Sequence, residues 1–485
     1  MPNSLRRLFE HRFPRFTIAF GWLILGSIVP VKAMATEACA IGSRVELFAD
    51  DYLVAKLNGD AHLVAKQPVA REVVFRADKP WEGSSSLYFT VFHDGPRFRM
   101  YYRGTQVRDR KLLHPEFTCY AESHDGIHWQ RPTLGLVEFN GSKQNNILLQ
   151  GIGAHNFTAF RDTNPDARPE ARYKAVGRGV RTPDGKIGTV HQLFAFQSAD
   201  GIHWQRMQEQ PILTDGRFDS QNVAFWDGAR RQYVCYFRDM LGGYRAIRSA
   251  LSNDFLLWKD VRFIGFRGAE RRHLYTNAIQ RYDRAPHMLI GFPTRFLPRQ
   301  QFPDQPDWTE PLFIAGRDGD SFKMWPKTII PNLRPEQQGN RGNYASWGLI
   351  QLPSEPGRYS LYASEARRSE SSMRLRRYTY RQDGFVAAQA QKGELITHPF
   401  TFTGDRLLVN FKTRPQGFLR VEIQESSGGT LPSWSLSTCQ KLSGDELAGE
   451  VKWKGAPSLE TLVGRPVRAR FEITDAEIYS FQFKE

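Results

Sequence analysis

Short runs of apolar and aromatic residues, separated by polar turn residues, recur along most of the chain. Runs of this length bounded by Gly, Pro, Asn and Asp are typical of β-strands. Leu87 to Phe92 and Phe98 to Tyr102 flank His93-Asp94-Gly95-Pro96, which predicts a hairpin. The same arrangement recurs at 157–176, 222–237, 278–292 and 345–363. Because no 15-residue window has a convincing 3.6-residue period, the pattern predicts an all-β chain.

A nine-residue motif occurs twice almost unchanged, as SHDGIHWQR at 123–131 and SADGIHWQR at 198–206. Weaker copies are found at 252–258, 317–322 and 382–385. An Asp-Gly pair supplies the positive φ of a tight turn, and the aromatic residue that follows it can pack. We therefore interpret the motif as structural. Five copies, each preceded by a hairpin, predict the four-stranded blades of a five-bladed β-propeller.

The predicted propeller spans residues 42–393, and a compact C-terminal β-sandwich is expected at 394–485. Alternating apolar runs separated by turn residues indicate the strands of the sandwich. These runs are 407–411, 418–424, 450–453, 467–473 and 478–483. Bracing of the propeller is the expected role of the sandwich, with direct carbohydrate binding as the alternative.

The N-terminal segment has the features of a signal peptide. Four arginines precede the apolar run 16–31, which is followed by Ala33-Met34-Ala35. The run is short for a membrane span, so residues 1–35 are expected to be a cleaved secretory leader. We predict a secreted or periplasmic protein with no membrane association after cleavage.

Composition narrows the range of ligands. The formal net charge of +15 makes an anionic ligand plausible. Nucleic acid is not expected, because the chain has no basic helix and no strand motif of aromatic and lysine residues. The four cysteines are widely scattered, and no spacing of His, Asp or Glu demands a metal ion. Neither a metal nor a cofactor is predicted.

Candidate catalytic residues lie just before the first strand of each repeat, where a propeller gathers its reacting groups. These segments are 81–85, 155–156, 219–222, 275–277 and 341–344. Glu82 and Asp219 are the only carboxylates in them, and glycosidic cleavage commonly uses two carboxyl groups. We expect Asp219 to be the nucleophile or base, and Glu82, desolvated beside Trp81, to be the general acid. Exchange of these two roles is the alternative.

Further residues of the same layer are expected to bind the substrate. The second strand of each hairpin returns to this face, and three of these strands end in arginine. The predicted binding residues are Trp81, Arg103, His155, Asn156, Asn222, Arg238, Tyr275, Asn277, Arg295, Arg341, Asn343 and Glu365. The arginines favour a carboxylated or sulfated sugar through bidentate contacts; pairing with the acids of the cavity is the alternative.

The five repeats, the C-terminal strands and the segment Arg161-Asp162-Thr163-Asn164-Pro165 resemble proteins with a glycoside hydrolase family 32 catalytic domain and a β-sandwich. The resemblance covers almost all of the chain after the leader. Family 32 enzymes carry Asn-Asp-Pro in the first blade, Arg-Asp-Pro in the second and Glu-Cys in the third. The first and third motifs are absent here. By resemblance, Asp162 is a third catalytic candidate that orients sugar hydroxyls; its alternative role is to form a turn.

The expected function is that of an exported glycoside hydrolase that acts on an oligo- or polysaccharide by a two-carboxylate mechanism. Anionic saccharides are among the expected substrates. A non-catalytic carbohydrate-binding propeller and a phosphate-dependent glycoside phosphorylase are the alternatives.

Overall fold

The computed structural model describes residues 38–485 apart from 110, 181–187, 299–307, 332–341 and 368–372. The predicted signal peptide and Arg341 lie outside the described residues. Within these ranges the chain is built from strands, with three short 3₁₀ turns at Pro169–Ala171, Pro432–Trp434 and Leu459–Leu462. The prediction of an all-β chain is confirmed. In this part of the chain no helix is long and apolar enough to cross a membrane.

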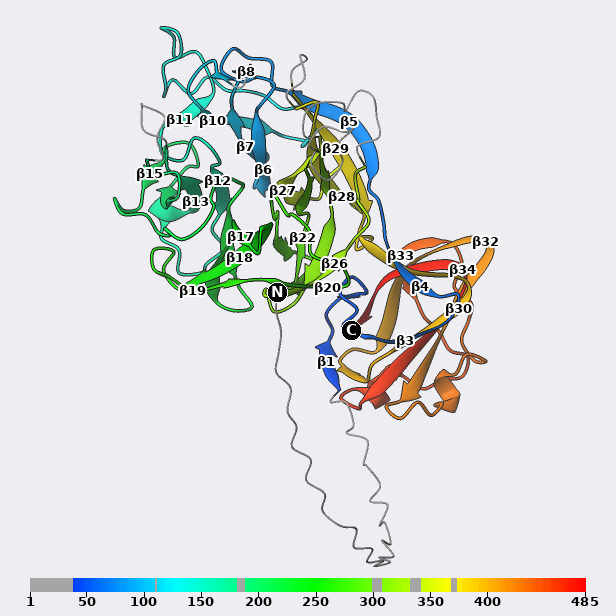
Figure 1. Cartoon of the computed structure of the whole chain (residues 1–485). Coiled ribbons are helices and arrows are strands. Elements are labelled where there is room, and N and C mark those ends of the chain that lie inside the picture. Colours follow the sequence, from blue (N-terminus) through cyan, green and yellow to red (C-terminus); the bar gives the residue numbers. More distant parts are fainter. Residues whose placement is uncertain (1–37, 110, 181–187, 299–307, 332–341, 368–372) are drawn as a thin grey trace, which may run out of the picture. The chain divides into compact units, whose positions relative to one another are not determined.

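Four-stranded antiparallel groups occur five times in the described sheets (Figure 1). The first group contains β6 (Leu87–Asp94), β7 (Arg97–Gly104), β10 (Phe117–Ser123) and β11 (Ile147–Gln150). The second contains β12 (Thr158–Arg161), β13 (Tyr173–Arg178), β14 (Leu193–Ser198) and β15 (Gln205–Arg206). The third contains β16 (Val223–Asp227), β17 (Gln232–Leu241), β18 (Tyr244–Ser252) and β19 (Trp258–Phe263).

The last two groups each receive a strand from elsewhere in the chain. The fourth group contains β21 (Gln280–Tyr282), β22 (Ala285–Gly291), β25 (Phe313–Gly316) and β26 (Ser321–Trp325), with β20 (Gly265–Arg267) parallel to β26. The fifth contains β27 (Tyr344–Ile350), β28 (Arg358–Glu365), β29 (Arg374–Arg381) and the early strand β5 (Val69–Arg76). One parallel bridge joins β27 to β6, so the first and last groups are linked.

Two short hairpins, β8 (Val107–Arg108) with β9 (Lys111–Leu112) and β23 (Thr294–Leu297) with β24 (Trp308–Pro311), extend from these groups. They follow the second strands β7 and β22, so the chain leaves the group at those two points before it continues. Arg295, on β23, therefore lies outside the fourth group, opposite Glu310 of β24.

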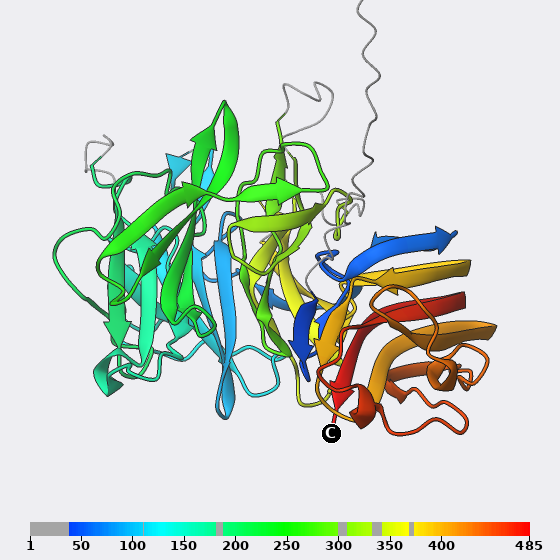
Figure 2. The same cartoon turned by 90° about the horizontal axis from the view of Figure 1, so that it is seen from below.

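A nine-stranded sheet contains the strands of the C-terminal part of the chain together with four short strands from the beginning of the described chain. Its long strands are β30 (Val386–Thr397), β32 (Arg406–Glu425) and β34 (Val467–Lys484), and Figure 2 shows the C-terminal strands side by side in yellow, orange and red. Its shorter strands are β1 (Cys39–Gly42), β2 (Glu46–Leu47), β3 (Val54–Gly59), β4 (His62–Ala65), β31 (Phe400–Phe402) and β33 (Asp445–Glu450). The pairing differs from the predicted division at residues 42 and 393, because β2–β4 and the start of β30 belong to this sheet.

The repeated Asp-Gly motif builds a turn in which one carboxylate fixes the backbone. Asp125 Oδ1 accepts hydrogen bonds from the amides of Ile127 and His128, both at 2.8 Å, and Asp200 repeats this arrangement. Gly201 has φ of +78°, and a Cβ there would lie 2.8 Å from the Tyr101 hydroxyl, so only glycine fits.

Each of these turns also receives a tyrosine from another strand group. Tyr101 of β7 donates to Gly201 O at 2.8 Å, Tyr362 of β28 donates to Gly126 O at 2.6 Å, and Tyr236 of β17 donates to Gly319 O at 3.0 Å. Every donor is on the second strand of its group, and every acceptor is the motif turn of the next group. The motif therefore aligns neighbouring groups, in agreement with its interpretation as structural.

Tyr362→Phe tests this alignment. Loss of the buried hydroxyl removes one hydrogen bond between the fifth and first groups, and we expect the free energy of unfolding to fall by about 1 kcal/mol. Denaturant unfolding measures the change. Tyr52→Phe, at a side chain that is 43% exposed, is the control and should have little effect. Equal stability of Tyr362→Phe and the wild type would mean that the hydroxyl does not hold the groups together.

Candidate functional site

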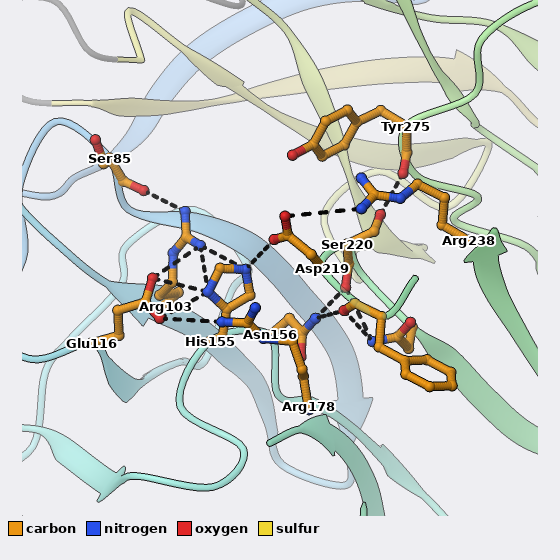
Figure 3. A network of polar contacts seen from close by, with 12 residues as sticks. Ser85, Arg103, Glu116, His155, Asn156, Arg178, Asp219, Ser220, Arg238 and Tyr275 are labelled. Atoms are coloured by element: carbon orange, nitrogen blue, oxygen red, sulfur yellow. Dashed lines mark hydrogen bonds and ion pairs between the residues drawn. The ribbon is translucent and has the colours of Figure 1, made fainter. Parts of the chain in front are cut away.

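The candidate site centres on a histidine held between two carboxylates. His155 Nδ1 lies 2.8 Å from Glu116 Oε2, and His155 Nε2 lies 2.8 Å from Asp219 Oδ1 (Figure 3). These residues precede β10, β12 and β16, so three strand groups each contribute one member. The His155 side chain is 12% exposed, whereas that of Asp219 is 55% exposed. Of these two side chains, Asp219 is therefore the one that a substrate can reach.

Both carboxylates are held in the ionised form. Burial alone would raise the pKa of Glu116, but the charge and hydrogen bond of His155, together with Arg103 and Arg178, lower that pKa to about 2. Burial would likewise raise the pKa of Asp219. The hydrogen bond and charge of His155, with Arg238 and Arg178, hold it well below its usual range. An ionised Asp219 suits the role of base or nucleophile and not that of an acid.

The backbone around Asp219 is fixed from both sides by asparagine amides. Asn156 Nδ2 donates to Phe218 O at 2.5 Å and to Ser220 O, which flank Asp219. Asn222 Nδ2 donates to the same two carbonyls, each at 3.1 Å. Since Asn156 and Asn222 are fully buried, they orient the Asp219 loop without touching a substrate. Both were predicted as binding residues, and the structure places them beneath the site as scaffold.

Three arginines contact this centre, and a fourth, Arg367, lies near Arg103. Arg103 lies on β7, Arg178 ends β13, Arg238 lies on β17, and Arg367 follows β28 by two residues. All four therefore come from second strands or their ends. Arg103 lies 3.5 Å from Glu116 Oε1, Arg178 lies 3.7 Å from Glu116 Oε2, and Arg238 lies 3.9 Å from Asp219 Oδ2.

Three tyrosine rings line the arginines. The guanidinium of Arg103 lies 4.9 Å from the centroid of Tyr88, that of Arg238 lies 4.9 Å from Tyr275, and that of Arg367 lies 5.6 Å from Tyr344. Tyr275 and Tyr344 meet edge to face at 5.6 Å. These contacts place an aromatic ring against each guanidinium inside a largely buried layer.

Five residues predicted from the sequence thus converge in one network. They are Arg103, His155, Asp219, Arg238 and Tyr275. Asn277 lies next to them as a further backbone support, because its amide donates to Gln221 O at 3.2 Å and to Tyr236 O at 3.1 Å.

Glu82 is not the partner of Asp219, and this part of the prediction is corrected. Its side chain is fully buried, and its two oxygens accept from Arg131 Nε at 2.8 Å and Arg131 Nη2 at 2.9 Å. Tyr102 also donates to Glu82. A carboxylate paired twice with one guanidinium has no free oxygen and no exposed edge to protonate a leaving group. Glu82 is a structural ion pair.

Asp162 is likewise structural. Its buried carboxylate accepts from Lys174 and, at 2.7 Å, from the Tyr233 hydroxyl, while Oδ1 accepts from the amide of Asn164 at 2.9 Å. The turn-forming role is the one observed, and the role implied by resemblance is not.

Four other predicted binding residues have partners away from the network. Trp81 Nε1 donates to Asn146 Oδ1 at 2.7 Å, and Arg295 pairs with Glu310 at 2.6 Å. Glu365 pairs with Arg376 at 2.7 Å, and Asn343 Nδ2 donates to Ile330 O at 3.3 Å. These partners lie outside the network, and the assignment of the four residues as substrate contacts stays a prediction.

Sequence reasoning missed Glu116, Arg178, Arg367 and Tyr88. Arg178 had an available signal, since 173–178 is the second strand of a predicted hairpin and ends in arginine, as 100–103 does. The sequence prediction considered only residues just before first strands and residues at the ends of second strands. Glu116 precedes a third strand and Arg367 lies two residues past a second strand, so neither was considered. Among the residues that the structure describes, no group of three or more His, Cys, Asp or Glu side chains is placed to hold a metal ion.

Comparison with known proteins gives low similarity throughout. No family model and no curated protein matches the chain. An N-acetylgalactosamine deacetylase from F. plautii, solved with blood group B trisaccharide, matches with 14% identity and a TM-score of 0.46 over 68% of this chain and 96% of that chain. A β-1,2-mannobiose phosphorylase from Listeria innocua matches with 13% identity and a TM-score of 0.43 over 63% and 92%. A glycosyl hydrolase from Bacteroides ovatus matches with 12% and 0.42 over 67% and 94%. At these values the matches do not bear on the activity of this chain, and the resemblance to family 32 stays a prediction.

Glu82→Gln tests the structural assignment of Glu82. The substitution leaves the Arg131 guanidinium without its buried counter-charge, so we expect the free energy of unfolding to fall by about 3 kcal/mol in denaturant unfolding. Glu209→Gln, which removes a surface partner of Arg206 at a side chain 82% exposed, is the control and should cost less than about 1 kcal/mol. A Glu82→Gln protein as stable as the control would contradict the assignment.

Glu116→Gln tests the charge pairing through pH. A carboxylate whose folded pKa is about 2 and whose ordinary pKa is 4.5 adds stability above pH 4.5 that is lost as the pH falls from about 4.5 to about 2. The unfolding free energy of the Glu116→Gln protein should therefore fall less steeply across this window than that of the wild type. Identical slopes would mean that Glu116 is not held by His155 and the arginines.

Proposed function

We propose that this protein is an exported carbohydrate-active enzyme that cleaves a glycosidic bond, with Asp219 as its reactive carboxylate. The observation that carries the proposal is the state of Asp219. Its carboxylate is exposed, held ionised and oriented by His155, while the backbone on both sides is fixed by asparagine amides. A carboxylate prepared in this way is placed for reaction more than for stability.

The fold supports this location for a reactive site. We infer that the five four-stranded groups are five propeller blades, with the loops before their first strands gathered on one side. Glu116, His155 and Asp219 come from loops of three different groups. Loops carried by a rigid β framework are common positions for binding and catalytic residues. Export follows from the predicted signal peptide at residues 1–35.

The proposed reaction gives His155 the role that Glu82 held in the sequence prediction. When His155 donates to both carboxylates, each of its ring nitrogens carries a proton. As the bond between the anomeric carbon and the leaving oxygen breaks, the leaving oxygen takes the Nε2 proton of His155. Asp219 either attacks the anomeric carbon, in which case water then displaces it from that carbon and leaves a proton on His155, or removes a proton from the attacking water and passes it on to His155. Hydrolysis then adds one water across the bond.

Glu116 is a positioning residue in this scheme. It contacts His155 Nδ1 and not the exposed side of the site. Its contact with Nδ1 fixes the direction in which Nε2 points.

Phosphate-dependent cleavage is the second candidate. Arg103, Arg178 and Arg238, which lie near Glu116 or Asp219, favour it, because guanidinium groups bind phosphate in bidentate fashion. In that case phosphate replaces water as the acceptor of the glycosyl group, and turnover requires phosphate.

Asp219→Asn tests the proposal. The purified chain lacking residues 1–35 is screened for cleavage of neutral, uronic and sulfated glycans, with and without phosphate. The variant should lose turnover by on the order of 10³-fold, because the amide can neither attack nor accept a proton. Asp215→Asn, in the same loop at a side chain 84% exposed, is the control and should retain turnover.

Glu116→Gln separates positioning from binding. It should lower kcat by roughly 10- to 100-fold with little change in KM, because the histidine is misdirected while the substrate contacts remain.

Unchanged turnover in Asp219→Asn would refute the site. Glycan binding by the wild type without any cleavage would favour the non-catalytic alternative.

A further inference from the structure

The arginines around Asp219 are buried without enough negative charge beside them. Arg103 is 5% exposed, Arg178 7% and Arg367 4%, and the side chain of Arg238 is 11% exposed. The two carboxylates in contact with them, Glu116 and Asp219, each direct an oxygen to His155 at 2.8 Å. The ion pairs left for the arginines are long, between 3.5 and 3.9 Å.

Three other buried or half-buried arginines of the described chain are paired more closely. Arg131 has Glu82 at 2.8 Å, Arg317 has Asp50 at 2.5 Å, and Arg377 has Glu72 at 2.8 Å. Arg367 differs from them, since no carboxylate of the described residues pairs with it. Its guanidinium packs against the ring of Tyr344. The fold can pair a buried arginine closely, and at this site it does not.

Unused hydrogen-bond donors point to the same shortage. Among the described residues, the Nε atoms of Arg103, Arg178 and Arg238 have no acceptor, and Arg367 lacks acceptors for both Nε and Nη1. Leaving a buried charged donor without an acceptor costs stability, so such groups normally have partners. Unused guanidinium donors also occur elsewhere in the described chain, as at Arg281, so it is their grouping around Arg103 that points to an external acceptor.

The electrostatics agree with this geometry. Burial lowers the pKa of Arg178, and burial together with the nearby Arg103 lowers that of Arg367. Each guanidinium is thus less stable in its charged form than an exposed one, and a bound anion would reverse this effect.

The backbone next to Arg367 is strained in a way that fits a binding role. Ala366 has φ of +56°, a region that residues with a Cβ seldom adopt. Tyr88, which lies under Arg103, has φ of +59°. Strain of this kind persists where a particular side-chain position is needed.

We propose that Arg178 and Arg367, assisted by Arg103 and Arg238, form an oxyanion subsite beside Asp219. It takes a carboxylate, sulfate or phosphate group, and it rests on the proposed function because that oxyanion belongs to the reacting partners. The group has two sources, an acidic substituent on the sugar or free inorganic phosphate. Each planar guanidinium can donate two hydrogen bonds to the oxygens of this group, while a tyrosine ring packs against the guanidinium of Arg103, Arg238 and Arg367.

Binding of inorganic sulfate to the chain lacking residues 1–35 tests the subsite without a substrate. Isothermal titration is performed on the wild type, Arg367→Gln and Arg295→Gln at constant ionic strength set with chloride. Arg367→Gln should weaken sulfate binding at least tenfold. Arg295→Gln should bind like the wild type, because Arg295 is paired with Glu310 outside the network. Equal sulfate affinity in Arg367→Gln and the wild type, or no sulfate binding by the wild type, would overturn the subsite.

Thermal unfolding of the same variants separates a ligand-binding arginine from a structural one. Arg367→Gln removes a buried charge that lacks a counter-charge, so its Tm in chloride should equal or exceed that of the wild type. Sulfate should raise the Tm of the wild type and not that of the variant. A clear fall in Tm for Arg367→Gln, with no difference in its response to sulfate, would make Arg367 a packing residue.

Two further arms identify the source of the oxyanion. Turnover of uronic or sulfated glycans without phosphate, reduced in Arg367→Gln, assigns the group to the sugar. Turnover of neutral glycans that requires phosphate assigns it to phosphate. Asp219→Asn distinguishes the two proposals, because it should retain sulfate binding while losing turnover. Retained turnover in Asp219→Asn refutes the proposed function. Unchanged sulfate affinity in Arg367→Gln refutes the subsite alone.

Discussion

The hydrogen bond between His155 Nε2 and Asp219 is the interaction on which the candidate site depends. It joins the loop before β12 to the loop before β16, and Glu116 extends it to the loop before β10. The same contact lowers the pKa of Asp219, so it determines the charge of the exposed carboxylate as well as its position. Without this histidine, Glu116 and Asp219 would lose the side chain that contacts both of them.

The antiparallel hairpin explains why arginines meet at this centre. The first strand of each group begins beside the end of the second, as Leu87 pairs with Arg103 and Thr158 pairs with Val176. A residue at the end of a second strand therefore reaches the loops that precede first strands. Arg295 does not follow this rule, because the chain after β22 forms the separate hairpin β23–β24 and pairs Arg295 with Glu310.

Local pattern was sufficient to predict the all-β chain, the role of the Asp-Gly motif and part of the site. Turn chemistry is encoded within a few residues, so Asp125 and Asp200 could be interpreted directly. Glu82 could not, because its partner Arg131 lies 49 positions away and only the folded chain shows the pair. Pairing of β3 and β4 with β30 is equally long-range. Arg367 depends on the backbone turn at Ala366, for which alanine gives no signal.

The central claim is that His155 donates from both ring nitrogens to two ionised carboxylates. A long-range ¹H–¹⁵N NMR spectrum of the chain with ¹⁵N-labelled histidine measures this directly, and His155→Gln identifies the signal among the 12 histidines of the sequence. Two protonated ring nitrogens, each with a downfield proton, are expected because each nitrogen lies 2.8 Å from a carboxylate oxygen. A neutral ring with one unprotonated nitrogen would show that only one carboxylate accepts, and it would contradict the account.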